Sequence, residues 1–266
     1  MIAFPNITPT AFNLFGIEIQ WYGIAYASGF FLGLFYCKNL ASKKITIDNK
    51  IFDDLILWIA LGTIIGGRLG YVIFYDLGFY LNNITLIVLD IRKGGMSFHG
   101  GMLGVIGSTY IYSKKKKLSF LKIIDLISCA APIGIFFGRI TNFINSELWG
   151  KPTSLPWGVV FPNGGEYPRH PSQIYEAFLE GIVIFLVLNY FYKKKFLKEG
   201  YCASLFLMLY GIFRIIIEFV REPDNHIGYI MGNFVTNGIL LSIPMIIVGC
   251  FIFLKVNGKF RKDIKK

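Results

Sequence analysis

Long apolar runs, separated by short polar stretches, make up most of the chain. Crossing the hydrocarbon core of a bilayer as a helix takes about 20 apolar residues. Runs of suitable length fall at roughly 17–37, 53–75, 96–112, 123–144, 173–192, 202–220 and 233–254. Lipid offers backbone groups no hydrogen-bond partners, so each run is predicted to be a helix. The pattern predicts an all-α polytopic membrane protein of about seven transmembrane helices, forming one domain over residues 1–266.

Composition supports this interpretation. Of the 266 residues, 54% are apolar and 16% are charged, and the mean hydropathy is +0.55. A soluble domain usually carries about a quarter of its residues as charged types. Residues 1–16 lack the basic segment and small-residue cleavage site of a removed signal peptide, so the first apolar run is expected to remain as an anchor.

The cysteines also fit an apolar interior. All lie inside apolar runs, and none forms a CxxC pair or another metal-ligand spacing. They are Cys37, Cys129, Cys202 and Cys250. We interpret them as small core or lipid-facing residues rather than as disulfides or metal ligands.

The positions of Lys and Arg predict the orientation. If the N-terminus lies outside, 19 of the 27 basic residues fall in cytoplasmic segments and 5 in outer segments. The cytoplasmic loops of membrane proteins carry such an excess of Lys and Arg, which supports an outer N-terminus. Seven spans then place the C-terminus in the cytoplasm. The net charge of +11 and the run Lys114–Lys117 would also suit a nucleic-acid partner. Because the run lies between two spans, we interpret it as a topology signal, and no nucleic-acid partner is predicted.

The longest outer segment covers roughly residues 145–172 and is rich in Gly, Pro and aromatic residues. We name it the cap. Its composition predicts a small, ordered periplasmic element rather than a linker.

Polar residues of the predicted spans gather toward the outer face. Ionisable side chains inside a membrane are costly and indicate a functional site by default. Arg139 and Asn142 lie in the outer half of the fourth span, and His99 opens the third. The whole set comprises Tyr22, Arg68, His99, Arg139, Asn142, Asn145, Glu147, Tyr210, Arg214, Glu218 and Arg221.

Spacing along the helices sharpens the set. Tyr210, Arg214 and Glu218 follow one another at intervals of four, so they form one polar stripe. Arg139 and Asn142 are three residues apart and share a face of their helix. Guanidinium groups match phosphate oxygens in a fork and stay charged in a dry site. Two arginines on different helices therefore favour an anionic ligand, and near the outer leaflet that is a phospholipid headgroup.

Structural alternatives stay open for most of these residues. Arg214 and Glu218 alone would make an ion pair within one helix. Asn142 and Asn145 would serve as hydrogen-bonding glue between helices, and Arg68 would extend to the outer headgroups. His99 would be a packing residue, although the glycines around it permit close backbone approach. His170 and His226 lie in outer loops and are less specific, and no metal site is predicted.

Several segments that contain these polar residues resemble a known family. GRITNFINSELWG, at 138–150, resembles the signature of bacterial prolipoprotein diacylglyceryl transferases. Further blocks agree in family order along almost the whole chain, with Thr141 where a small residue such as Gly is common. They are QWYGIAYASGF at 20–30, GGMSFHGGMLG at 94–104, RHPSQIYEA at 169–177 and YGIFRIIIEFVREPDNHIG at 210–228.

The resemblance implies a reaction and a location. Such an enzyme of the bacterial inner membrane transfers the sn-1,2-diacylglyceryl group of phosphatidylglycerol to the lipobox cysteine of a preprolipoprotein signal peptide. A thioether forms, sn-glycerol 1-phosphate leaves, and no metal or other cofactor is needed. The family's important residues map onto Tyr22, His99, Arg139, Asn142, Glu147, Gly150, Tyr210, Arg214 and Glu218.

From this chemistry we expect Arg139 and Arg214 to stabilise the departing phosphate, and His99 to accept the thiol proton. Glu147 and Glu218 would orient the arginines or bind glycerol hydroxyls, while Asn142 and Tyr22 would donate to lipid oxygens. The rival functions are an anion or lipid transporter and a different lipid-modifying transferase. A transporter should carry polar residues to both membrane faces, whereas these stop on one side.

Overall fold

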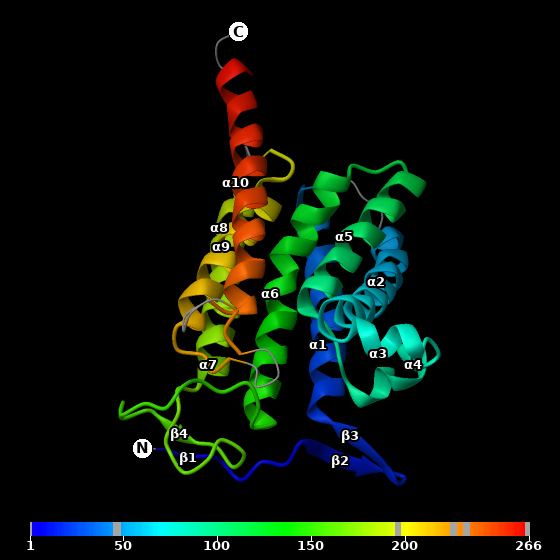
Figure 1. Ribbon diagram of the computed structural model, residues 1–266. Coiled ribbons are helices and arrows are strands. Elements are labelled where there is room, and N and C mark those ends of the chain that lie inside the picture. The colour runs from blue at the N-terminus through cyan, green and yellow to red at the C-terminus, as the bar shows by residue number, and fades with distance from the viewer. Residues whose placement is uncertain (1, 45–48, 195–197, 224–227, 231–234, 264–266) are drawn as a thin grey trace. The chain divides into compact units, whose positions relative to one another are not determined.

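Helices account for most of the computed structural model, which describes residues 2–44, 49–194, 198–223, 228–230 and 235–263 (Figure 1). The loop histidine His226 lies outside these residues, as do Lys195, Lys265 and Lys266 of the predicted cytoplasmic segments. The chain divides into two units. The first unit comprises Met1–Tyr36 and Ile127–Lys266, and the second unit comprises Cys37–Leu126.

The helical elements follow in chain order. They are α1 (Trp21–Lys44), α2 (Asn49–Tyr75), α3 (Leu77–Asn82), α4 (Leu86–Leu89), the 3-10 helix η1 (Asp90–Lys93), α5 (Phe98–Lys115), α6 (Phe120–Ile144), α7 (Ser172–Glu176), the π-helix η2 (Ala177–Val183), α8 (Ile184–Lys193), α9 (Tyr201–Glu218) and α10 (Asn237–Asp263). The strands are β1 (Ile2–Ala3), β2 (Thr10–Leu14), β3 (Ile17–Gln20) and β4 (Val159–Val160).

Hydropathy predicted the long helices well. Among the described residues, five helical stretches are long and apolar enough to cross a membrane, and they coincide with the second and the last four predicted spans. They are Lys50–Tyr75, Phe120–Ile144, Ser172–Lys193, Tyr201–Glu218 and Asn237–Gly258. The first and third predicted spans fall on α1 and α5, which are helical over 24 and 18 residues but are richer in Gly, Ser and Tyr. That these two also cross the bilayer stays a prediction.

The predicted start of the first span, at residue 17, is wrong. Residues 17–20 form strand β3, which pairs antiparallel with β2, and the helix starts only at Trp21. The sequence IEIQ alternates apolar and polar residues, which suits a strand better than a helix. Phe15 and Gly16 make the turn with φ values of 51° and 83°, as a tight hairpin requires. The expected all-α architecture therefore carries short strands as well.

Large apolar side chains remain exposed along the long helices. Phe31 and Phe35 of α1 are 73% and 70% exposed, and Phe251 and Leu254 of α10 are 66% and 69% exposed. Water would make these surfaces costly, whereas lipid tails would cover them without penalty. Their exposure supports the membrane assignment.

In the second unit, α2 and α5 pack through glycines. Gly62, Gly66 and Gly70 lie at intervals of four on α2 and face Gly100 and Gly104 of α5. A Cβ atom at any of these positions would collide with backbone atoms of the opposing helix. Small residues allow such close approach in membrane helices, where lipid supplies no hydrophobic drive for association.

Arg68 of α2 ties the segment between α2 and α5 to the helix. Its guanidinium donates to the carbonyl oxygens of Ile87 at 2.7 Å, Leu86 at 3.0 Å and Gly94 at 3.0 Å, and to Tyr80 Oη at 3.1 Å. The residue is only 3% exposed. The alternative in which Arg68 extends to lipid headgroups is therefore wrong, because its donors are used by backbone carbonyls inside the unit.

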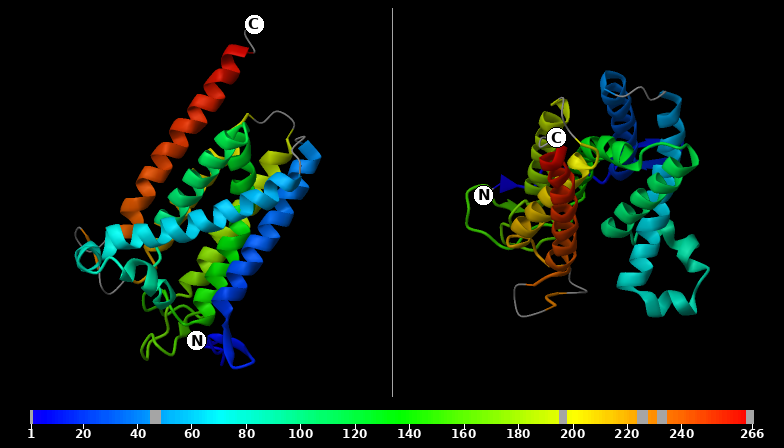
Figure 2. Two further views of the ribbon diagram at one scale, coloured as in Figure 1. Left: turned by 90° about the vertical axis from the view of Figure 1, so that its right-hand side faces the viewer. Right: turned by 90° about the horizontal axis from the view of Figure 1, so that it is seen from above.

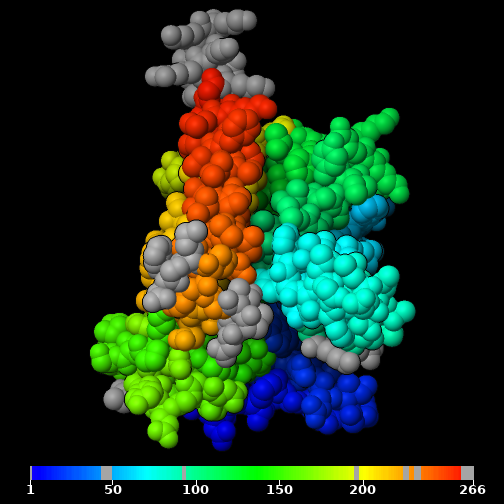
Figure 3. All heavy atoms as spheres, in the orientation of Figure 1, coloured from blue at the N-terminus to red at the C-terminus, as the bar shows by residue number. Residues whose placement is uncertain are grey.

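The first unit is built around α6 and the helices that follow it (Figure 1). Gly29 of α1 lies against Gly134 of α6, so closely that a Cβ atom on Gly29 would come within 2.9 Å of the Gly134 Cα atom. Gly211 of α9 packs on Ile246 of α10, and α10 runs as one long helix (Figure 2). Side chains of α10 form a continuous column over one face of this unit (Figure 3).

Residues 145–171 form the cap as an ordered but mostly irregular segment. Its strand β4 pairs in parallel with β1, so the N-terminal residues lie against it. The rings of Phe4, Phe143 and Phe161 contact one another in tilted or edge-on arrangements, with centroid separations of 5.4–5.7 Å. Ser172, predicted as the last cap residue, already begins α7.

We predict that Gly104→Ala destabilises the protein, because the added methyl group collides with the Gly62 carbonyl of α2. Overpacking of this kind costs about 1–3 kcal/mol, so the thermal midpoint in detergent should fall. Gly107→Ala is the matched control on the same helix, where an added Cβ has no neighbour within 4 Å. Equal midpoints for the two variants would contradict the proposed close contact.

Candidate active site

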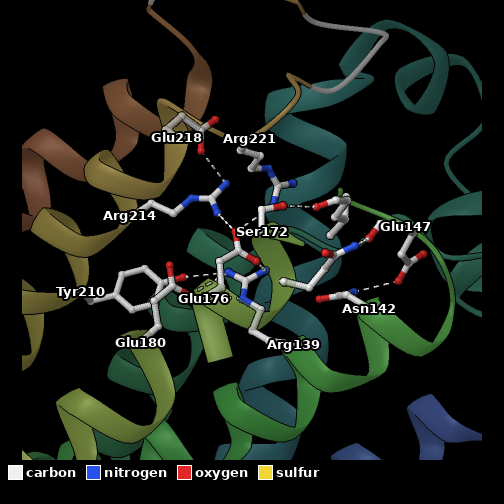
Figure 4. A network of polar contacts seen from close by, with 12 residues as sticks. Arg139, Asn142, Glu147, Ser172, Glu176, Glu180, Tyr210, Arg214, Glu218 and Arg221 are labelled. Carbon is white, nitrogen blue, oxygen red and sulfur yellow. Dashed lines mark hydrogen bonds and ion pairs between the residues drawn. The ribbon is translucent and has the colours of Figure 1, made fainter. Parts of the chain in front are cut away.

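The Glu176 carboxylate lies at the centre of a buried network in the first unit (Figure 4). Oε2 is 3.2 Å from Nη1 of Arg139, and Oε1 accepts a hydrogen bond from Nη1 of Arg221 at 2.9 Å. Oε1 also pairs with Nη1 of Arg214. The glutamate comes from the end of α7, Arg139 from α6 and Arg214 from α9. One carboxylate therefore connects Arg139 with Arg214 and Arg221, which lie close together much further along the chain.

Glu180 forms a second pair with Arg139. Its Oε2 accepts from both Nη2 and Nε of Arg139, at 3.0 Å and 3.2 Å. Nη2 also lies 3.4 Å from the Tyr210 hydroxyl of α9. Glu180 belongs to the π-helix η2, a distortion that is frequent at functional sites.

Glu218 holds Arg214 from the other side. Its Oε2 is 3.0 Å from Nη2 of Arg214, and its Oε1 accepts from the Thr236 hydroxyl at 2.8 Å. Thr236 precedes α10, and a Cβ on the nearby glycine, Gly238, would touch the Glu218 carboxylate. The negative charge thus lies at the N-terminus of α10, where a helix dipole stabilises it.

Formal charges in this cluster balance. Arg139, Arg214 and Arg221 face Glu176, Glu180 and Glu218, which we name together the arginine–glutamate cluster. The side chains of Arg139 and Arg214 retain 16% and 11% exposure, whereas those of Glu176 and Glu180 have none. A ligand entering from outside therefore meets arginine before it meets these two carboxylates.

A separate polar group lies near the cap. Tyr22 of α1 donates to Oε1 of Glu147 and accepts from the Asn142 amide of α6. Asn142 Nδ2 also donates to Oε1 of Glu147, at 2.8 Å. The expected interhelical hydrogen bond of Asn142 is thus confirmed. Among the described residues, no ion pair joins Glu147 to an arginine, so its carboxylate is directed to the tyrosine and the amide.

The backbone around Glu147 is strained and held from α7. Ser146 and Leu148 have φ values of 53° and 58°, in the left-handed region that non-glycine residues rarely adopt. Gln173 Nε2 donates to the Glu147 carbonyl at 2.5 Å, and Ser172 Oγ donates to the Leu148 carbonyl at 2.9 Å. These two bonds fix the conformation that presents Glu147.

Gly150 serves the packing of the cap. Its N–H donates to the His170 carbonyl at 2.8 Å, and a Cβ here would collide with Val220 and His170 backbone atoms. The structure explains the need for glycine by this close approach. A ligand contact of Gly150 stays a prediction.

His99 is the predicted site residue that belongs to the second unit. It lies in the first turn of α5, whose N-cap Ser97 accepts from the Gly100 N–H at 3.2 Å. The glycine contacts of α5 with α2 include Gly100, directly after the histidine. Its role as acceptor of the thiol proton stays a prediction.

Sequence reasoning missed two residues of the cluster and undervalued a third. Glu176 and Glu180 are absent from the predicted set. Arg221 belongs to that set but was assigned no role, although it is only 5% exposed. The sequence does carry a signal for Glu176 and Glu180. They lie four residues apart within a predicted span, and placing a carboxylate inside a membrane is costly, as it is for an arginine. The ion pair of Arg214 and Glu218, expected as a structural alternative, does form, but as part of the larger network.

Nothing in the described ranges gathers His, Cys, Asp and Glu into a set of three or more that could hold a metal ion. The outer-loop His170 lies with Nδ1 3.3 Å from the Tyr175 hydroxyl, and burial lowers its pKa. Cys37, Cys129 and Cys202 are buried and form no disulfide among the described residues, as expected for small core residues.

Known proteins resemble this chain over almost its full length. The family model described as "Prolipoprotein diacylglyceryl transferase" matches residues 9–255. Proteins named phosphatidylglycerol–prolipoprotein diacylglyceryl transferase are 45% identical in Nitratidesulfovibrio vulgaris (strain DP4), over 95% of each chain, and 41% identical in Brucella anthropi, over 98% of this chain and 96% of the relative. The relative from Rickettsia felis is 44% identical over 97% of this chain and all of its own length.

We predict that Glu176→Ala strongly destabilises the first unit, since it leaves three arginines without their shared counter-ion. Removing one partner of a buried ion pair typically costs about 3–5 kcal/mol. Unfolding midpoints in detergent measure the loss. Glu222→Ala is the control: Glu222 pairs with Arg169 but is 39% exposed, so its removal should cost no more than about 1 kcal/mol. A Glu176 variant as stable as the control would refute the anchoring role.

Proposed function

The chain belongs to the prolipoprotein diacylglyceryl transferase family, and on that premise we propose that its arginine–glutamate cluster holds the phosphate of the lipid substrate. The enzyme transfers the diacylglyceryl group of phosphatidylglycerol to prolipoproteins, the first step of lipoprotein maturation. The observation that carries the proposal is the convergence of Arg139 and Arg214, from different helices, on one buried carboxylate.

The reaction is a displacement at carbon. The thiol of the lipobox cysteine in the signal peptide loses its proton, and the thiolate attacks C3 of the glyceryl unit. A C–S bond forms while the C–O bond to phosphate breaks, so a thioether results and sn-glycerol 1-phosphate leaves. The phosphate gains one negative charge as it departs. Catalysis therefore requires a proton acceptor and cations beside the leaving group.

Arg139 and Arg214 supply the cations. Their carboxylate partners hold them in place, so the positive groups need little reorganisation when charge develops on the leaving phosphate. Some guanidinium side-chain surface stays accessible, as a bidentate contact with phosphate oxygens requires. Glu218 orients Arg214 through their 3.0 Å pair. Tyr210, beside Arg139, completes the lining of this site.

The Tyr22, Asn142 and Glu147 group binds the uncharged part of the lipid headgroup. Hydroxyl, amide and carboxylate functions lie together here, and these can exchange hydrogen bonds with glycerol hydroxyls and ester oxygens. Gly150 keeps the neighbouring cap backbone close. His99 acts as the general base toward the cysteine thiol, because a histidine titrates near neutral pH.

The transferase works in the bacterial inner membrane with its site toward the periplasm. The asymmetry of Lys and Arg supports seven spans, an outer N-terminus and a cytoplasmic C-terminus. The cap then faces the side where exported precursors emerge. The family match favours transfer over the rival transporter function, and phosphatidylglycerol, a lipobox peptide and membrane lipid are the expected partners.

The decisive experiment supplies phosphatidylglycerol labelled in its diacylglyceryl group together with a lipobox peptide. Label should reach the peptide cysteine with the wild-type protein, and Arg139→Ala should lower turnover by about 10²–10³-fold, as loss of one oxyanion donor does. A peptide with Ser in place of Cys is the control. Absence of label with intact wild-type protein would refute the transferase, and normal turnover of Arg139→Ala would refute the phosphate contact.

For the proton acceptor we predict that His99→Gln lowers turnover by about 10²–10⁴-fold, the usual contribution of a general base. Gln keeps the size and hydrogen-bonding capacity of the side chain but cannot take the proton. The measurement is the same transfer assay, repeated at rising pH, where the variant should recover as the thiol ionises without help. Near-normal transfer at neutral pH would exclude His99 as the obligatory base.

A further inference from the structure

Glu180 occupies the side of Arg139 that suits a phosphate. The Nε and Nη2 groups of a guanidinium form a fork that two anion oxygens match. In this structure both groups donate to Oε2 of Glu180, at 3.2 Å and 3.0 Å, while Nη1 is taken by Glu176 (Figure 4). An incoming phosphate that uses this fork must replace the Glu180 oxygen.

The carboxylates of the cluster differ in how firmly they are held. Glu176 is shared by three arginines, and Glu218 is held by Arg214 and Thr236. Glu180 pairs with Arg139, and its other oxygen, Oε1, is buried with no hydrogen-bond partner in the part of the chain that the structure describes. Moving Glu180 away therefore breaks its pairing with one arginine, whereas moving Glu176 would break three ion pairs.

Charge balance determines the protonation state of Glu180 after that exchange. The cluster has three arginines and three glutamates, so a bound phosphodiester adds one uncompensated negative charge. Glu180 has no exposed side-chain surface, and an isolated buried carboxylate is so costly that it takes up a proton instead. The buried, unpartnered Oε1 offers the position for that proton.

We infer that Glu180 is a displaceable counter-ion and positioning residue, which releases the Arg139 fork to the substrate phosphate and takes up one proton as it does so. Phosphate oxygens replace Oε2 of Glu180 at the Nε and Nη2 hydrogens, and a hydronium ion or buffer acid of the solvent gives up a proton to the Glu180 carboxylate. No other bond forms or breaks, and release of the phosphate reverses the exchange. This role rests on the proposed function, because it assumes that Arg139 receives the phosphate.

The groups that face Glu180 determine the sign of its pH dependence. They are Arg139 of α6, Glu176 of α7, and Tyr210 and Arg214 of α9. When phosphate takes over the fork, the nearby negative charges of the ligand and Glu176 favour the protonated carboxyl. Since binding consumes a proton, affinity for a phosphodiester should fall as pH rises.

The test uses glycerophosphoglycerol, the soluble headgroup diester, as the probe with the full-length protein in detergent. Its phosphodiester stays monoanionic across the range, so its own titration does not contribute. Binding is followed directly by phosphorus NMR from about pH 6 to about pH 9, which needs no catalytic turnover. For the wild type, affinity should fall by up to about tenfold per pH unit, the slope for one proton taken up.

Glu180→Gln should bind the probe more tightly at high pH, and with little pH dependence, because the neutral amide competes for the fork more weakly than a carboxylate and cannot titrate. Glu180→Asp should keep a pH slope. Glu166→Gln, which removes a carboxylate from the exposed cap surface, is the matched control and should behave as the wild type does.

A Glu180→Gln variant with the wild-type slope would place the proton on another group, such as His99, and would overturn the proposal. A flat wild-type profile would overturn it as well. The proposed function is judged separately by the labelled transfer assay. A protein that transfers label but shows no Glu180-dependent slope is a transferase without this counter-ion exchange.

Discussion

One buried carboxylate imposes the main constraint on the first unit. Glu176 has no exposed side-chain surface and pairs with Arg139, Arg214 and Arg221. Charges in a membrane interior are tolerated only when they are paired, so α6, α7 and α9 must be arranged with these side chains together. A slip of any helix by one residue would turn a charged group toward lipid. The pairing therefore specifies the helix register where apolar contacts alone would leave it weakly defined.

The same pairing shapes the chemistry. Three arginines with no counter-ions would bind any anion and would destabilise the fold by mutual repulsion. Three glutamates make the cluster neutral at rest, so an anion binds only by sharing or displacing a carboxylate already in place. If the cluster holds the substrate phosphate as proposed, such competition would weaken binding of the ground-state phosphodiester, whereas the additional charge on the departing phosphate would strengthen its interaction with the same guanidinium groups. Neutrality at rest would then favour the transition state over the bound lipid.

The sequence predicted much of this structure, but not which charged side chains of different helices form ion pairs. Hydropathy located all the long helices, because burial in lipid requires continuous apolar runs. It misplaced the start of the first span, where alternation in residues 17–20 forms a strand. Polar residues at helical spacing identified Arg139, Arg214 and Glu218. Tertiary packing decides which residues of different helices come into contact. Glu176 and Glu180 pair with arginines of α6 and α9 that lie far from them in the sequence, so no local sequence pattern predicts these pairs.

Helix α7 connects the two polar groups, although it has only five residues. At its first turn, Ser172 and Gln173 bind the carbonyls of Leu148 and Glu147 and so hold the strained backbone that presents Glu147 to Tyr22. At its end, Glu176 holds the arginines. Arg139 and Asn142, three residues apart on α6, complete the second connection. Because α7 and α6 both connect the arginine–glutamate cluster to the Tyr22 group, neither group can move without straining the other. Under the proposed function, one connected frame would hold the lipid headgroup, which suits a reaction that must keep one carbon in line between an attacking sulfur and a departing oxygen.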